Sequence, residues 1–104
     1  MKPGKPVHPS NGTGTAPDAA TLPGGIQVSF DEGPNKAARA STLQVVITNR
    51  EAAQNLEVSF ADGRDGYWFA IAPNTTLPFP VSVFRLYLRG ASGGTAAYSV
   101  IGVV

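Results

Sequence analysis

The acidic and aromatic residues between positions 58 and 74 are the densest concentration of side chains that could do chemistry. The stretch VSFADGRDGYWFAIAPN holds Asp62 and Asp65, each followed by glycine, directly before a Tyr-Trp-Phe run at 67–69. Carboxylates at close spacing could belong to a calcium loop, and adjacent aromatic rings could stack on a sugar. The same letters also fit a turn between two strands, because Asp-Gly steps are frequent in hairpins.

Calcium is the weaker interpretation of these carboxylates. The ion requires about six to eight oxygen ligands, whereas Asp62 and Asp65 enclose the positive charge of Arg64. The other acidic pair, Asp31 and Glu32, follows a separate strand-like run. We therefore expect two turns at these positions and no metal site.

The sequence lacks the residues that usually support nucleophilic catalysis. His8 is the single histidine, it lies in a proline-rich and glycine-rich segment, and the chain has no cysteine. A serine or threonine nucleophile would need an adjacent base, and none is available from a second histidine. The only compact glycine-rich run, GASGG at 90–94, precedes a strand-like run instead of a helix, which is unlike a phosphate-binding loop. We expect a protein that is not an enzyme and has no cofactor.

The charge balance argues against a nucleic-acid partner. The formal net charge is +1 and only 14% of the residues are charged, without a basic cluster. No apolar run approaches the length of a membrane span, and none follows the basic residues at the start as in a secretory signal peptide. We expect no nucleic acid, no membrane association and no export by such a signal.

Residues 1–25 are predicted to form an extended arm. They hold five of the nine prolines and five of the twelve glycines, and no aromatic residue. Proline removes backbone donors and glycine raises the entropy cost of ordering, so this segment should add little to a core and should become ordered only against a neighbouring chain. Lys2, Lys5, Val7 and Leu22 are its candidate partner-binding residues.

Residues 26–104 change to alternating apolar and polar residues, which indicates strands. In the run VFRLYLRG, Leu86 and Leu88 face one way while Arg85, Tyr87 and Arg89 face the other. Prolines make PNTTLPFP at 73–80 an edge or crossover segment. Helical turns are conceivable only at 35–41 and 49–55, and both are too short to be stable alone. The expected strands lie at 26–30, 42–50, 55–60, 67–71, 83–90 and 95–104.

Six or seven short strands with turn signals between them predict an all-β domain at 26–104, in the form of a small antiparallel β-sandwich or a jelly-roll-like domain. The roughly 79 residues of this domain are close to the size at which a single core becomes marginal. A partner would therefore help to stabilise such a small core.

Two aromatic and cationic features are candidate partner-binding sites. Trp68 lies within an apolar run, so a position in the core or at a subunit interface is favoured over an open sugar platform. Arg85, Tyr87 and Arg89 form a stripe along one strand face, and both residue types are enriched at protein interfaces. A solvated outer face of a sandwich explains the stripe equally well.

Residues 55–104 resemble small virion proteins of tailed bacteriophages, of the capsid cement or decoration type. The likeness consists of a VSF-x-D-G strand and turn, an aromatic strand ending in I-x-P, an L-x-L-x-G strand and a final Y-x-V-I strand. The resemblance implies a β-sandwich on the capsid surface, in a homotrimer whose arms extend over the major capsid protein. It supplies no site residues. The alternative is a carbohydrate-binding or adhesion module of a fibre or surface protein, with glycan stacked on Trp68.

Overall fold

The computed structural model describes residues 6–7, 12–30, 44–61, 67–81, 83 and 85–103. Within these residues there are strands and turns but no helix, and hence no helix that could cross a membrane. The helical turn considered for 49–55 is absent, and the one considered for 35–41 lies outside the described residues.

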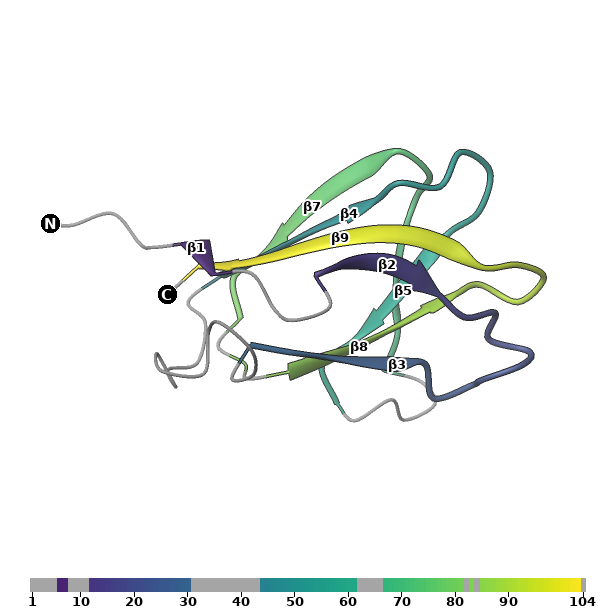
Figure 1. Ribbon diagram of the computed structural model, residues 1–104, viewed down its shortest axis with the longest axis horizontal. Coiled ribbons are helices and arrows are strands. Elements are labelled where there is room, and N and C mark those ends of the chain that lie inside the picture. Colours follow the sequence, from purple (N-terminus) through teal and green to yellow (C-terminus); the bar gives the residue numbers. More distant parts are fainter. Residues whose placement is uncertain are drawn as a thin grey trace, which may run out of the picture.

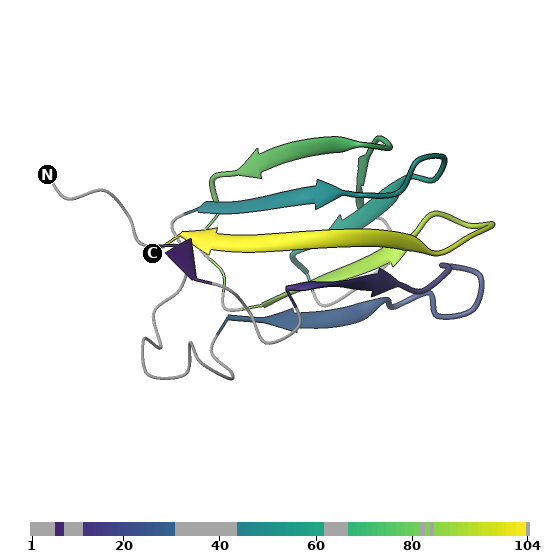
Figure 2. The same cartoon turned by 45° about the horizontal axis from the view of Figure 1, so that its top comes forward.

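Two antiparallel sheets pack face to face (Figures 1 and 2). Sheet A has the order β1-β9-β4-β7, with β2 pairing beside β1 on the same edge of β9, and sheet B has the order β3-β8-β5-β6. The strands are β1 (Pro6–Val7), β2 (Thr13–Ala16), β3 (Ile26–Ser29), β4 (Gln44–Asn49), β5 (Leu56–Ser59), β6 (Phe69–Ile71), β7 (Thr75–Phe79), β8 (Arg85–Gly90) and β9 (Ala96–Val103).

The strand connectivity is that of a jelly roll. Strands β2 to β9 pair from the outside inward, as β2 with β9, β3 with β8, β4 with β7 and β5 with β6. Such nested pairing of eight strands produces two four-stranded sheets that share one interior, and β1 adds a fifth strand to sheet A. The predicted all-β sandwich is confirmed, and the pairing resolves it as the jelly-roll form.

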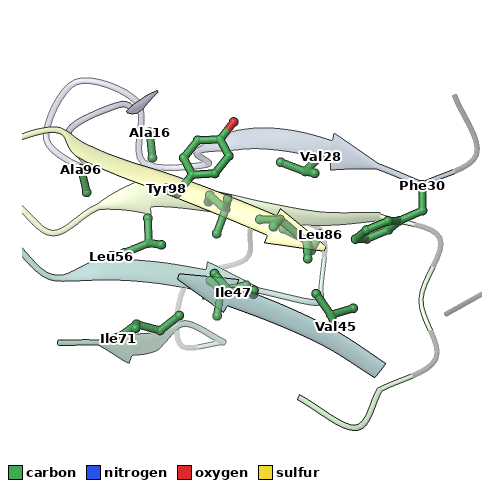
Figure 3. Close-up of a cluster of buried hydrophobic side chains, with 13 residues drawn as sticks. Ala16, Val28, Phe30, Val45, Ile47, Leu56, Ile71, Leu86, Ala96 and Tyr98 are labelled. Carbon is green, nitrogen blue, oxygen red and sulfur yellow. The ribbon is translucent and has the colours of Figure 1, made fainter. Parts of the chain in front are cut away.

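Alternation along the strands builds the core between the sheets. In β8, Leu86 and Leu88 are fully buried, whereas Arg85 is exposed. Strand β9 alternates in the same way, with Tyr98 and Val100 directed inward. Figure 3 shows side chains from both sheets meeting in this interior, including Ile47 from sheet A and Leu56 from sheet B. Because the side-chain period of a strand is two, the sequence pattern places Leu86 and Leu88 on one face of their strand, and this face is the buried one.

The structure differs from the predicted arm at residues 12–25. Thr13–Ala16 forms β2, which pairs with β9 over four residues, and Ala16 is fully buried. The following turn continues into β3 and donates backbone hydrogen bonds to Gly90 and Asp18. The residues of this strand are small and do not alternate between apolar and polar. The sequence pattern therefore did not predict that their backbone pairs with β9. The segment that precedes the sandwich is therefore shorter than 25 residues.

The proline-rich segment at 73–80 contains β7, which pairs only with β4 among the described strands. It is thus an edge strand, as predicted. Asn74 adopts a positive φ of 55° in the turn from β6 to β7, a conformation that asparagine tolerates better than most residues. The turn connects the edge of sheet B to the edge of sheet A and closes this side of the sandwich.

Candidate binding surface

The outer faces of the two sheets differ in chemistry. The outward residues of sheet A are small or neutral, and none carries a charge or an aromatic ring. They are Thr13, Thr15, Gln44, Val46, Thr48, Thr76, Pro78, Ala97, Ser99, Ile101 and Val103.

The outer face of sheet B carries the cationic and aromatic stripe. Register places Arg85, Tyr87 and Arg89 of β8 between the neighbouring strands β3 and β5. Tyr87 lies opposite Gln27 and its hydroxyl donates to Gln27 Oε1 over 3.4 Å. Arg89 lies opposite Glu57. The three residues that the sequence assigned to one face do share one face.

Arg89 is the centre of a packed cluster on this face. Its Nε donates to Glu57 Oε1 over 2.6 Å, and one terminal nitrogen donates to the backbone carbonyl of Pro23. Its guanidinium carbon lies 4.0 Å from the centroid of the Trp68 ring. A planar cation over an indole ring gains from the ring quadrupole while its edges remain free for hydrogen bonds. Arg89 therefore joins β5, β8, the β2–β3 turn and Trp68.

Trp68 packs against the outside of sheet B and not in the core between the sheets. Besides Arg89, its ring approaches Gly25, where an added Cβ would lie 3.1 Å from the indole. The Nε1 atom is buried without a hydrogen-bond partner among the described residues. Gly25 has a φ of 70°, a left-handed conformation that suits glycine. Packing within its own subunit thus occupies much of the ring.

The accessible part of the face lies over β3 and β8. Gln27 and Arg85 are exposed and Tyr87 is half-buried, whereas the outward Ser29 and Ser59 are buried. Leu22, immediately before the Pro23 carbonyl that binds Arg89, is 44% exposed. The surface therefore combines a cation, a phenol, an amide and an apolar side chain.

The remaining sequence-predicted residues are Val7, Lys2 and Lys5. Val7 lies in β1, across sheet A, where Pro6 and Val7 pair with Val103 and Gly102 of β9. Lys2 and Lys5 lie outside the described residues.

A second surface was missed by the sequence analysis. The side chains of Phe60, Phe69 and Phe79 form a cluster, here called the phenylalanine cluster, with ring centroids 5.4 to 6.4 Å apart. Phe69 is 57% exposed and Tyr67, two residues earlier, is 59% exposed, although strand alternation over 67–71 would put both on the side of the buried Ile71. Phe69 does pair with Val58 on the inward side, but β6 is the edge of its sheet. The Phe69 side chain therefore points toward the inner side of the sheet but stays exposed, because it lies on an edge strand.

Groups that could hold a metal or titrate unusually are few among the described residues. These residues contain no group of three potential metal ligands, and the acidic residues 31, 32, 62 and 65 lie outside them. Burial raises the pKa of the Tyr98 phenol, but this group faces the core. Comparisons of the chain with protein-family models, curated proteins and solved structures found no match.

Proposed function

We propose that this protein is a non-enzymatic structural virion protein of the capsid cement or decoration type, which binds the major capsid protein of a tailed bacteriophage. One observation carries the proposal: the outer face of sheet B gathers Arg85, Tyr87, Arg89 and Trp68, while the outer face of sheet A has no charged or aromatic residue. Arginine, tyrosine and tryptophan dominate the binding energy of protein interfaces.

The fold is compatible with this function by analogy. Jelly rolls occur in viral capsid proteins and also in lectins, so the fold alone does not separate the two. In this function Arg85 and Tyr87 contact the partner, while Arg89 and Trp68 pack against each other and stabilise the surface. Repetition of a modest contact in a homotrimer on a symmetric shell would multiply its strength.

The direct test is retention on capsids that lack the protein. Purified protein is mixed with these capsids, and bound protein and the temperature of capsid disruption are measured after sedimentation. We expect the double variant Arg85→Ala, Tyr87→Ala to bind about tenfold more weakly or worse. The matched control is Thr13→Ala, Thr15→Ala on the outer face of sheet A, which should bind as the parent does. Equal binding by both double variants would refute this surface as the contact.

The arm needs a narrower deletion than the 25 residues of the sequence prediction. Removing residues 1–25 would also remove β2 and the buried Ala16, so lost binding would report unfolding. Removing residues 1–5 leaves every described strand intact. If this deletion leaves both capsid retention and capsid heat stability unchanged, the arm does not serve as a capsid clamp.

A carbohydrate-binding module of a fibre or surface protein is the second candidate. It is favoured by the exposed Gln27 beside the half-buried Tyr87 and by Trp68 on the same sheet face, because sugars bind to aromatic rings flanked by amides. Arg89 covers part of the Trp68 ring, which speaks against stacking there. A glycan array with the parent, Trp68→Ala and Tyr87→Ala separates the candidates, since glycan binding that is lost in a folded variant would support the module.

A further inference from the structure

The phenylalanine cluster is a partly exposed apolar surface that the sheet B contact does not use, with Phe69 exposed and Phe60 and Phe79 half-buried. Its three rings lie where β6 and β7, the edge strands of the two sheets, come together. Leu77, Val81 and Val83 are only partly buried against the same core. A partly open aromatic cluster of this kind marks a contact site more often than isolated surface residues do.

The exposed area suits a peptide segment better than a flat protein face. Phe69, the most exposed ring of the cluster, is 57% exposed, which corresponds to about 100–150 Å² for one aromatic side chain. A stable interface between two globular subunits needs about 800 Å² from each. An extended segment that lies across the rings would use the available area fully.

The chain itself supplies a segment with matching chemistry. Pro3, Pro6 and Pro9 recur every three residues in MKPGKPVHP. Three residues make one turn of the polyproline II helix, so prolines at this spacing lie on one side of an extended segment. Aromatic-lined surfaces bind such segments because little conformational entropy remains to be lost.

Register locates this segment relative to the phenylalanine cluster. Pro6 pairs with Val103, Val103 pairs with Gln44, and the next residue, Val45, pairs with Phe79. Pro6 and Phe79 therefore lie at the same end of sheet A but at opposite edges, which Figure 2 shows as purple β1 and green β7 on either side of β9 and β4.

Register keeps Pro6 away from the phenylalanine cluster of its own subunit. Strand β1 is three strand spacings from β7, about 14 Å. A chain whose β1 stays paired therefore cannot place Pro6 on its own phenylalanine cluster, so a contact that uses both prolines of the Pro-x-x-Pro segment needs a second copy.

We propose that the Pro-x-x-Pro segment of one copy, residues 1–6, docks on the phenylalanine cluster of a second copy. The donor and acceptor surfaces lie at opposite edges of the molecule, so the contact is head to tail. Repeated head-to-tail contacts close into a ring when the rotation between subunits permits it. This contact would hold together the homotrimer of the proposed function. The number of copies, three, rests on that proposed function.

The test uses isolated protein without capsids, so its failure is distinct from failure of capsid binding. Sedimentation equilibrium of the full chain should give a multiple of the 10.8 kDa monomer mass, and the chain lacking residues 1–5 should be monomeric. A synthetic peptide of residues 1–9 should then bind this shortened chain saturably, with Trp68 fluorescence as the signal because Trp68 lies between Tyr67 and Phe69. The control peptide with Pro3→Ala and Pro6→Ala should bind about tenfold more weakly.

Two variants locate the docking site. Phe69→Ala in the full chain should give monomers, and thermal unfolding shows whether it remains folded. If it does not fold, Phe69→Leu replaces it, because leucine keeps an apolar side chain at this position but removes the aromatic ring. Thr95→Ala, an exposed residue at the opposite end of the sandwich, should assemble as the parent does. A monomeric full chain, a shortened chain that still assembles, or equal binding of the two peptides would each overturn the proposal.

Discussion

The side-chain amide of Asn49 donates a hydrogen bond of 2.9 Å to the backbone carbonyl of Ile71, and this bond joins β4 in sheet A to β6 in sheet B. The same nitrogen donates to the Gln54 carbonyl over 2.7 Å, while the side-chain oxygen accepts from the Glu51 amide. Asn49 is fully buried. One polar side chain thus organises the 50–55 turn and ties the two sheets together.

Asn49→Ala should destabilise the protein strongly. The substitution removes three hydrogen bonds and leaves buried backbone groups without partners, so the free energy of unfolding should fall by about 2–4 kcal/mol. Urea unfolding followed by circular dichroism measures this change. Asn55→Ala, in the same turn but exposed, is the matched control and should stay within about 0.5 kcal/mol of the parent. Similar losses in both variants would contradict the role of Asn49.

Neighbouring glycines 24 and 25 should respond differently to alanine. At Gly25, φ is 70° and an added Cβ would lie 2.5 Å from the Leu88 carbonyl oxygen and 3.1 Å from Trp68, so Gly25→Ala should cost about 2–4 kcal/mol. At Gly24 an added Cβ meets nothing within 4 Å, and Gly24→Ala should be neutral or stabilise by about 0.5 kcal/mol. Thermal unfolding of the two variants compares them directly. Equal melting temperatures would contradict both the left-handed conformation of Gly25 and its close approach to the Leu88 carbonyl.

Arg89→Lys should weaken the outer face of sheet B although it keeps the charge. Lysine cannot bind Glu57 and the Pro23 carbonyl while lying flat on Trp68, so we expect a loss of about 1 kcal/mol. Since Trp68 is the only tryptophan, its emission maximum should also shift to longer wavelength as water reaches the ring. Arg85→Lys, at an exposed position on the same strand, should leave both stability and emission unchanged. An unchanged emission maximum in Arg89→Lys would contradict the stacking.

The sequence predicts local features of the fold well. Alternation assigns Leu86 and Leu88 inward and Arg85, Tyr87 and Arg89 outward, and prolines mark β7 as an edge, because each rule depends on residues that are adjacent in the chain. Strand order is not local, so it is not visible in the pattern. The strand at Thr13–Ala16 was missed because its pairing with β9 uses backbone groups that any residue carries.

The candidate site could be predicted only in part for the same reason. The stripe on β8 follows from strand periodicity, whereas the position of Trp68 depends on Gly25, 43 positions away in the sequence, leaving room over the sheet. Phe69 and Ile71 point to the same side of β6, yet only Ile71 is buried. Periodicity gives the direction of a side chain, and its burial depends on whether another element covers that edge.

Tyr98 should make stability depend on alkaline pH. Burial disfavours the phenolate and raises the pKa of Tyr98 above its ordinary value of 10.0 in the folded state. Above pH 10 the unfolded state therefore releases the proton first, so the folded state binds more protons and the free energy of unfolding falls as pH rises. The slope from this group approaches about 1.4 kcal/mol per pH unit between the unfolded and folded pKa values. Below pH 10 its contribution is constant.

Tyr98→Phe isolates this contribution, because arginine, lysine and the other tyrosines are common to both proteins. The variant should lose about 1 kcal/mol or less at neutral pH, since only the hydroxyl and its interactions are removed. Urea unfolding of both proteins between pH 8 and pH 11 should show that the difference in stability shrinks or reverses at the alkaline end. Parallel curves over the whole range would mean that the Tyr98 phenol ionises as readily in the folded state as in the unfolded one, and that water reaches the core beside β2.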